Sequence, residues 1–428
     1  MLCSLLLLAA GDLVVVSDFQ SPFFIAFDPS LPIDGTFYGT PFLTGPLGTT
    51  IGPDGLLYVA DEITNRVLRF QPWDGLYIDA FVEDDPGTTV DETGGLNGPS
   101  SVVFGPDRRL YVGSFNGDAV LAYDGRTGAF DGVFVAPSDG NLDGPDSGMV
   151  FGPDGNLYVP SYFSRRVKRY DGVTGAFIDN AASPIGSGLR NPRSVVFPGD
   201  GSLLVTSEGS DEVLRFDGAN GAFQGVFIGD DPATAVDESG GLDGPTGIAR
   251  AADGSWWVGS VNTGDIKRYA ADGTYLETRV SGGLTAPVHV TIFPVAEIEC
   301  FGLANSVGAG ASLVARGSTS VAANDFRLEL NDAPSQQLAV FVQGDAGTPA
   351  LAGDGQLCIG APFFRFASSS TSLAGTAEAR LDLSQPAVPA AAITAGSTWR
   401  FQAGYRDALG PGGTGFNLSS SVAVRFTP

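Results

Sequence analysis

The chain is poor in basic residues, histidine and cysteine. Its 428 residues include 23 Lys and Arg against 48 Asp and Glu, and Lys168 and Lys267 are its lysines. The formal charge of −25 repels phosphate backbones and anionic lipid, so we expect no nucleic-acid partner. This acidity favours solubility in an extracellular or salty setting, or attraction of cations. A lone histidine, His289, cannot build a multi-histidine metal site.

Other catalytic signatures are also missing from the sequence. It has no phosphate-binding loop, no Cys/His nucleophile arrangement and no basic aromatic platform. Its serines have no plausible base nearby in the sequence. Familiar nucleophilic and phosphate chemistry is therefore not indicated.

Glycine and proline are abundant by contrast. The 60 Gly and 28 Pro are spread along the chain beside many Val, Phe and Tyr, which is typical of short strands joined by tight turns. A hydrophobic content of 43% excludes wholesale disorder and allows one large or two ordinary cores. The composition therefore predicts an all-β fold.

The first ten residues, MLCSLLLLAA, form a short apolar run that ends in small residues. Such a run is typical of the apolar region and cleavage site of a signal peptide, although a basic start is missing. It is too short to span a bilayer. We expect residues 1–10 to be an export leader; the alternative is a buried first strand.

Loss of that leader would remove Cys3 and leave Cys300 and Cys358. Two cysteines in an exported β-domain favour a disulfide, and two buried free thiols are the alternative. Closing this loop of roughly 60 residues is worth about 4 kcal/mol. Zinc is not expected, because the surrounding segment has no histidine.

A 14-residue repeat organises the first two thirds of the chain. Five segments align without a gap, each with an apolar residue ten positions after its first, and residues 14–27 (VVVSDFQSPFFIAF) fit the same frame. The five are 57–70 (LYVADEITNRVLRF), 110–123 (LYVGSFNGDAVLAY), 157–170 (LYVPSYFSRRVKRY), 203–216 (LLVTSEGSDEVLRF) and 256–269 (WWVGSVNTGDIKRY). Each segment predicts a hairpin.

A Leu-x-(Gly/Asn/Ala)-Pro motif and a β-rich run precede these hairpins, and a Gly-Ala-Phe turn follows several of them. Each unit therefore holds four antiparallel strands, A to D, which is typical of a propeller blade. Residues 287–293 (PVHVTIF) supply a strand A without a strand B, whereas Val14 begins a strand B without a strand A. We predict that the two pair, and that residues 11–295 form a six-bladed β-propeller closed by its terminal strands.

The pattern GPxxVVFGPDGxLYV, as in 98–112 and 144–159, resembles NHL-repeat propellers and their SMP-30/gluconolactonase-like and streptogramin-lyase-like relatives. The resemblance covers about two thirds of the chain and implies the fold more than any activity, because these families mix enzymes with binding modules. It implies, as one option, a divalent ion held by oxygen ligands in the channel.

A second domain is expected over residues 296–428, where the composition shifts to Ala, Ser and Gly. Short apolar runs between turn signals, such as DFRLELND and STWRFQAGYRD, predict a β-sandwich. The segments DGQLCIG, WRFQAGYRD and VRFTP resemble a terminal module of bacterial secreted proteins. That resemblance implies no activity.

The loops between strands B and C should surround the mouth of the propeller channel, together with the connections from strand D to the next strand A. We expect polar residues there to bind or react with a ligand. His289, Asp61 and Glu208 are the candidate catalytic residues, with the histidine as proton carrier; a hydrogen-bonded channel residue is the other interpretation of His289. Candidate ligand-binding residues are Asp18, Glu62, Ser114, Ser161 and Ser260.

Two long acidic connections are near copies of each other and are expected to face each other across the mouth. Their carboxylates suit a hard cation such as calcium, although the spacing is not that of an EF-hand and solvated acidic loops are the alternative. The candidate metal ligands are Asp84, Asp85, Asp91, Glu92, Asp230, Asp231, Asp237 and Glu238.

Two functions are compatible with these features. The first is a secreted or cell-surface binding or scaffold protein, monomeric, which presents an acidic channel face to a small molecule, glycan or protein. The second is a metal-dependent lactonase or lyase at the same mouth. No cofactor is certain, and calcium is the one candidate.

Overall fold

The computed structural model contains strands, turns and four short 3₁₀ segments, and the residues that it describes include no α-helix. None of its described helical segments is long and apolar enough to cross a membrane. The 3₁₀ segments are η1 (Phe115–Gly117), η2 (Asp139–Asn141), η3 (Glu208–Ser210) and η4 (Pro389–Ala391). The described residues are 12–19, 21, 23–27, 36–39, 42–54, 56–72, 75–230, 233, 236–251, 253–281, 284–294, 296–300, 302–308, 310–316, 321, 324, 326–386, 388–394 and 397–426.

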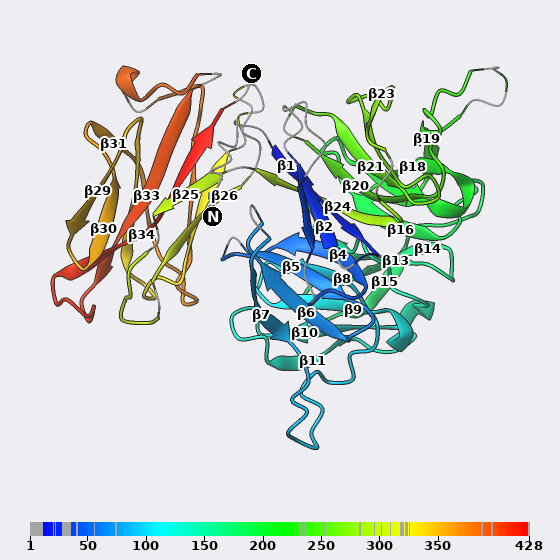
Figure 1. The fold of residues 1–428 in the computed structure, drawn as a ribbon, viewed down its shortest axis with the longest axis horizontal. Helices are drawn as coiled ribbons and strands as arrows, with labels where there is room; N and C mark the ends of the chain where they lie inside the picture. Colours follow the sequence, from blue (N-terminus) through cyan, green and yellow to red (C-terminus); the bar gives the residue numbers. More distant parts are fainter. Residues whose placement is uncertain are drawn as a thin grey trace.

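Six four-stranded antiparallel sheets occupy the first two thirds of the described chain (Figure 1). Strands A of sheets 1 to 6 are β24 (Pro287–Pro294), β4 (Pro46–Ile51), β8 (Pro99–Phe104), β12 (Val150–Phe151), β16 (Pro192–Val196) and β20 (Pro245–Arg250). Strands B are β1 (Asp12–Asp18), β5 (Leu57–Asp61), β9 (Leu110–Ser114), β13 (Leu157–Ser161), β17 (Ser202–Ser207) and β21 (Trp256–Ser260). Strands C are β2 (Phe23–Phe27), β6 (Arg66–Phe70), β10 (Ala119–Tyr123), β14 (Arg166–Tyr170), β18 (Glu212–Asp217) and β22 (Asp265–Tyr269). Strands D are β3 (Thr36–Gly39), β7 (Tyr77–Val82), β11 (Phe130–Val135), β15 (Phe177–Ala182), β19 (Phe223–Ile228) and β23 (Tyr275–Val280).

The two ends of this region meet in one sheet, as the sequence predicted. β1 pairs with β24 over its whole length, with Val14 opposite Ile292 and Val16 opposite Val290. The sheet order is β24-β1-β2-β3, so the strand that ends the region supplies the missing strand A of the first sheet. This pairing protects the edge that β1 would otherwise expose.

The apolar core lies between neighbouring sheets. Each of six clusters of buried side chains joins one sheet to the next, and one of them joins Val14 and Ile25 of the first sheet to Trp257 and Ile266 of the sixth. The alternation of strands explains this arrangement, because successive side chains of strands B and C point to opposite neighbours. Sheets stacked in this way are the core of a β-propeller.

The C-terminal part contains two sheets that share one core. One sheet has the order β25-β34-β33-β28-β31 and the other β26-β27-β32, with the hairpin β29-β30 beside them. Phe341 and Phe401 of the first sheet pack with Leu328 and Leu330 of the second. The strands are β25 (Ala296–Cys300), β26 (Ser312–Arg316), β27 (Arg327–Asn331), β28 (Leu338–Gly344), β29 (Gly347–Ala352), β30 (Gly355–Ile359), β31 (Phe363–Ser370), β32 (Ala377–Arg380), β33 (Thr398–Asp407) and β34 (Gly415–Arg425).

The predicted disulfide concerns two strands of this part. Cys358 is buried in β30, and Cys300 ends β25. The side chain of Cys300 lies outside the described residues. The link from Cys300 to Cys358 therefore stays a prediction, as does the leader, which is also outside the described residues.

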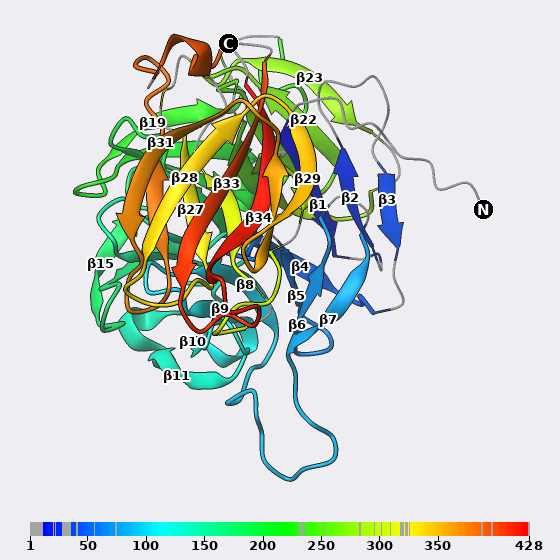
Figure 2. The same ribbon diagram turned by 90° about the vertical axis from the view of Figure 1, so that its left-hand side faces the viewer.

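Arg108 joins the C-terminal part to the propeller. The C-terminal part lies beside the propeller in Figure 1 and in front of it in Figure 2. Arg108 Nη2 donates to Asn331 Oδ1 at 2.6 Å, and its Nη1 donates to Ala374 O at 3.3 Å. Arg108 stands at a turn position with φ of 69°, where the corresponding residue of the fourth sheet is Gly155. A left-handed backbone conformation at a residue other than glycine costs about 1 kcal/mol or more. The hydrogen bonds from Arg108 to the C-terminal part are what this strained turn makes possible.

Candidate functional site

The last residue of strand B accepts a backbone hydrogen bond with its side chain in all six described sheets. In four sheets it is a buried serine whose Oγ accepts a hydrogen bond from the loop that leads into strand A of the same sheet. The donor and acceptor are Asn97 N and Ser114 (3.0 Å), Asp143 N and Ser161 (2.9 Å), Arg190 N and Ser207 (2.9 Å), and Asp243 N and Ser260 (3.0 Å). We call these residues, with Asp18 and Asp61, the latch residues.

The two aspartates do the same work with a carboxylate. Asp18 accepts hydrogen bonds from Thr285 N (2.9 Å) and Ala286 N (2.6 Å). Asp61 accepts one from Gly45 N (2.6 Å), and both aspartates are fully buried. The carboxylates of Asp18 and Asp61 thus accept hydrogen bonds from backbone donors, and the catalytic and ligand-binding roles expected of the latch residues stay predictions.

His289 forms hydrogen bonds with two threonines, and the catalytic role expected of it stays a prediction. Its Nδ1 lies 3.2 Å from Thr49 N and 3.1 Å from Thr49 Oγ1, with Thr291 Oγ1 at 3.3 Å. A backbone N–H can only donate, so Nδ1 is the acceptor and the ring is neutral there. Burial lowers the pKa of His289 to about 4. The contacts correspond to a hydrogen-bonded channel residue that joins the first sheet to the second.

The residue after each latch is half-buried in all six sheets. Two of them, Glu62 and Glu208, are among the residues that the sequence selected. The complete set is Phe19, Glu62, Phe115, Tyr162, Glu208 and Val261. We call this set the rim, and it combines two carboxylates with three aromatic rings.

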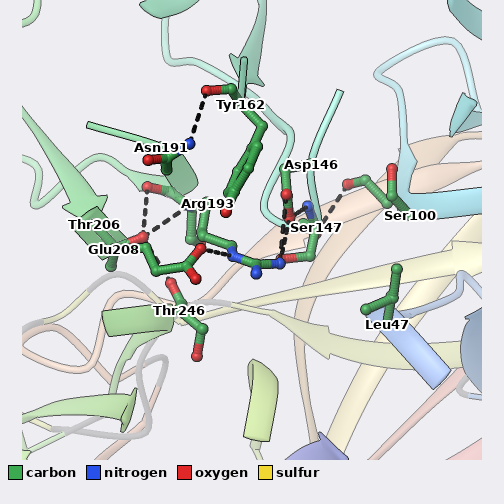
Figure 3. Close-up of polar contacts among 12 residues, drawn as sticks. Leu47, Ser100, Asp146, Ser147, Tyr162, Asn191, Arg193, Thr206, Glu208 and Thr246 are labelled. Carbon is green, nitrogen blue, oxygen red and sulfur yellow. Dashed lines mark hydrogen bonds and ion pairs between the residues drawn. The ribbon is translucent and has the colours of Figure 1, made fainter. Parts of the chain in front are cut away.

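An ion-pair chain below the rim was not found from the sequence. The Arg193 guanidinium lies between two carboxylates: its Nε donates to Glu208 Oε2 at 2.6 Å, and its Nη1 lies 3.4 Å from Asp146 Oδ1 (Figure 3). The Tyr162 ring covers the guanidinium, with 5.0 Å between Arg193 Cζ and the ring centroid. Ser147 N donates to Asp146 Oδ1 at 2.6 Å, and the buried Ser147 Oγ has no hydrogen-bond partner within the described residues.

Asp146 and Arg193 occupy equivalent positions, each directly after the proline of the Leu-x-(Gly/Asn/Ala)-Pro motif of its unit. The corresponding residues elsewhere are Leu47, Ser100, Thr246 and Val288. A signal was therefore present in the sequence: this position carries a charge in two units only. The position lies outside the 14-residue frame, which covers strands B and C.

Burial and charge act against each other in this cluster. Burial raises the pKa of Asp146, although the charge of Arg193 opposes the rise. Burial disfavours the charge of Arg193, but the carboxylates of Asp146 and Glu208 overcome this and raise its pKa. The guanidinium is therefore charged at any pH at which the protein folds.

Glu62 belongs to the same electrostatic environment. Its pKa is raised by burial first, and then by the negative charge of Asp146, while Arg193 opposes both. Arg193 pairs with Asp146 and Glu208, and Glu62 is close enough for the charges of Asp146 and Arg193 to act on its pKa. These four groups therefore carry an excess of negative charge when all are ionised.

The first acidic loop lies apart from this cluster. Asp84, Asp85 and Asp91 are exposed and Glu92 is half-buried in the connection from β7 to β8, which projects away from the sheets in Figures 1 and 2. Its polar groups bond within the loop: Glu92 N donates to Asp84 Oδ1 at 3.2 Å, and Thr93 Oγ1 donates to Asp91 Oδ1 at 2.6 Å. The acidic wall expected across the mouth stays a prediction.

The second acidic loop repeats two of these bonds. Glu238 N donates to Asp230 Oδ1 at 3.2 Å, and Ser239 Oγ donates to Asp237 Oδ1 at 2.7 Å. Asp231 lies outside the described residues. Among the residues that are described, no three His, Cys, Asp or Glu side chains come together as a metal-binding group. Calcium binding by these loops stays a prediction.

No protein-family model matches the chain, and no curated protein sequence matches it. Solved structures do match. The structure of a nidogen/laminin complex is similar with a TM-score of 0.51 and 15% identity, over 66% of this chain and 98% of the other. A streptogramin B lyase matches with a TM-score of 0.45 and 15% identity, over 65% and 85%. An inactive virginiamycin B lyase from Staphylococcus aureus matches with 0.44 and 15%, over 67% and 94%. At this identity the likeness shows the fold alone, and the chain has the fold of a β-propeller.

Proposed function

We propose that this protein is an extracytoplasmic binding protein whose propeller mouth takes small organic cations, such as primary amines. The observation that carries the proposal is a charge imbalance in one cluster at the mouth: Arg193 pairs with Asp146 and Glu208, and Glu62 lies within the field of Asp146 and Arg193. An ammonium group near Glu62 would relieve the repulsion that raises the pKa of this carboxyl.

The rim offers more than charge to such a ligand. The ring centroids of Phe115 and Tyr162 lie 6.3 Å apart. Phe115 belongs to the third sheet, next to the sheet of Glu62, and Tyr162 belongs to the fourth sheet, next to the sheet of Glu208. Aromatic faces attract ammonium groups by about 0.5–2 kcal/mol. The buried Ser147 hydroxyl beside Asp146 adds an unsatisfied polar group. A compact amine with an apolar body fits this combination better than an anion or a neutral sugar.

The architecture belongs to the same proposal. We take the six sheets as the blades of one closed ring of the NHL-repeat or SMP-30-like kind, which holds the rim residues at fixed positions. The two C-terminal sheets then form a β-sandwich of the module found in bacterial secreted proteins, appended for attachment or recognition. The leader-like residues 1–10 and the candidate Cys300–Cys358 disulfide support a place outside the cytoplasm.

Titration calorimetry with benzylamine tests the function. We expect benzylamine to bind and benzyl alcohol, which has the same ring without the charge, to bind at least about tenfold more weakly. The variants Glu62→Gln and Glu208→Gln should each weaken benzylamine by about tenfold or more, because each removes one charge-assisted contact. Equal affinities for the amine and the alcohol would sink the proposal.

Glu92→Gln is the matched control. It removes the same single charge from the exposed loop after β7, so it alters the overall field equally without touching the mouth. Its benzylamine affinity should equal that of the unaltered protein. A loss as large as that of Glu62→Gln would show that the long-range field, rather than the mouth, attracts the amine.

The metal-dependent lactonase or lyase remains the alternative. The mouth geometry does not favour it, because the single histidine contacts threonines, and the latch carboxylates Asp18 and Asp61 are committed to backbone donors. Turnover of a lactone or ester that requires a divalent cation, and that Glu62→Gln abolishes, would replace the binding proposal with this enzyme.

A further inference from the structure

We propose that a groove between the fifth and sixth sheets binds a small carboxylate with an apolar body. The groove lies at the end of the sheets that carries the turns from strand A to B and from C to D, opposite the mouth. Its volume is about 400 Å³. Its walls come from Leu204, Arg215 and Phe227 of the fifth sheet and from Arg250 and Trp256 of the sixth.

The groove exists because two aromatic residues are missing. At three other interfaces, a tyrosine of strand B packs edge-on against a phenylalanine at or directly after the end of strand A of the next sheet. The pairs are Tyr58 with Phe104, Tyr111 with Phe151, and Tyr158 with Phe197, with centroids 5.0, 5.1 and 4.8 Å apart. Leu204 and Arg250 stand at these two positions between the fifth and sixth sheets, so a space that is filled elsewhere is open here.

The fifth sheet also lacks the strand D carboxylate that pairs with the strand C arginine in two other sheets. Strand C carries an arginine in the second and fourth sheets, and each is clamped by an aspartate opposite it on strand D: Arg69 Nε donates to Asp79 at 2.7 Å, and Arg169 Nε to Asp179 at 3.0 Å. In the fifth sheet, Gly225 stands opposite Arg215.

Arg215 therefore keeps a single acidic partner. It bonds to Asp200, and its Nε is buried with no acceptor among the described residues. An unsatisfied buried donor of this kind costs about 1–3 kcal/mol. A ligand carboxylate would restore the acceptor that Asp79 and Asp179 supply in the sister sheets.

Arg250 adds a second positive charge to the groove. Its guanidinium lies over Trp256, with 5.2 Å between Cζ and the ring centroid, and its Nη1 donates to Pro198 O at 2.6 Å. No described carboxylate forms an ion pair with it. Asp200 and Asp272 also line the groove. Asp200 accepts a hydrogen bond from Arg215, and Asp272 accepts one from Thr274 N at 3.0 Å.

The ligand class follows from these groups. Two guanidiniums with spare donors select a carboxylate, and the side chains of Leu204, Phe227 and Trp256 select an apolar body beside it. The volume suits a small molecule and not a polymer. The groove and the acidic mouth are at opposite ends of the sheets and take ligands of opposite charge, so the two proposals stand or fall separately.

Titration calorimetry with 3-phenylpropanoate tests the groove. We expect the carboxylate to bind, and the neutral 3-phenylpropanamide to bind at least about tenfold more weakly. Arg215→Met should weaken 3-phenylpropanoate by about tenfold or more. Arg169→Met is the matched control, because Arg169 is already clamped by Asp179, and it should leave the affinity unchanged. No binding of 3-phenylpropanoate at about 10 mM would overturn the proposal.

A second variant distinguishes loss of the site from loss of the fold. Leu204→Tyr with Arg250→Phe copies a pair that this chain already uses three times, so the protein should fold normally while the groove is filled. We expect 3-phenylpropanoate binding to disappear and benzylamine binding at the mouth to persist. If this variant still bound the carboxylate with unchanged affinity, the groove would not be its site.

Discussion

Two sets of residues at the mouth obey different rules. The six latch residues at the ends of strand B are serine or aspartate, are buried, and bind the backbone of the loop that leads into strand A. The residues that follow the proline of the Leu-x-(Gly/Asn/Ala)-Pro motif share no chemistry: they are Leu47, Ser100, Asp146, Arg193, Thr246 and Val288. The first set builds the same corner six times, and the second set makes one side of the mouth unlike the other.

The difference teaches where function lies in a repeat protein. A residue type that recurs at every repeat serves the repeat itself, because each sheet needs the same turn and the same loop anchor. A residue type that occurs in one or two repeats is free to serve a ligand. The ion-pair chain of Asp146 and Arg193 is such a departure, and so are Leu204, Gly225 and Arg250 in the groove.

The largest expected effect comes from removing one partner of the ion pair between Asp146 and Arg193 at the mouth. Arg193→Met leaves Asp146 buried without its cation, and removing one partner of a buried ion pair typically lowers the free energy of unfolding by about 3–5 kcal/mol. Urea denaturation at pH 7 should show this loss. The loss should shrink as the pH falls, because burial already raises the pKa of Asp146 and an unpaired carboxyl protonates more readily.

The double variant Asp146→Asn with Arg193→Met is the control. It removes both charges and leaves no buried carboxylate, so it should regain at least half of the lost stability. A double variant as unstable as Arg193→Met alone would mean that packing of the arginine against Tyr162, and not charge pairing, is what the position supplies.

His289 sharpens the comparison, because it is a unique residue whose contacts are structural. The pKa of His289 is about 4 in the folded protein, lowered by burial, against about 6.5 in the unfolded chain. The unfolded chain therefore binds a proton that the folded protein refuses, and stability is lost as the pH falls from about 6.5 to about 4. The loss should reach about 2–3 kcal/mol in denaturation curves taken across this window.

His289→Asn isolates this contribution. The asparagine keeps a hydrogen-bonding side chain beside Thr49 but does not titrate, so the slope of stability between pH 6.5 and 4.5 should flatten. An unchanged slope would assign the acid sensitivity to the carboxylates instead.

The fold could be predicted from the sequence to a large extent, because a repeat shows the same pattern several times. The 14-residue frame indicated hairpins at the positions of β5 with β6 and β21 with β22, and the pairing of β1 with β24 followed from two incomplete units. The contact of Arg108 with Asn331 could not be foreseen, because it joins residues that are far apart in the sequence and follows no pattern.

The candidate site was less predictable for a physical reason. Asp61 and Glu62 are adjacent acids in the sequence, yet β5 ends at Asp61, which is buried against its own loop, and Glu62 lies in the turn that follows, on the rim. Asp146 and Arg193 are far apart in the sequence, and their charges form an ion pair only in the folded structure. Comparing the units with one another, rather than searching for acidic residues, is the reasoning that would have found them.

The smallest effect concerns the latch. Asp61→Ala should lower the free energy of unfolding by about 1–3 kcal/mol, because Gly45 N loses its buried acceptor. Asp61→Ser should cost less than about 1 kcal/mol, since serine does this work in four sister sheets. Urea midpoints of the two variants measure the difference. If Asp61→Ser lowered the stability as much as Asp61→Ala, the charge of Asp61 would be what the position requires. The six latch residues would then not share one hydrogen-bonding role.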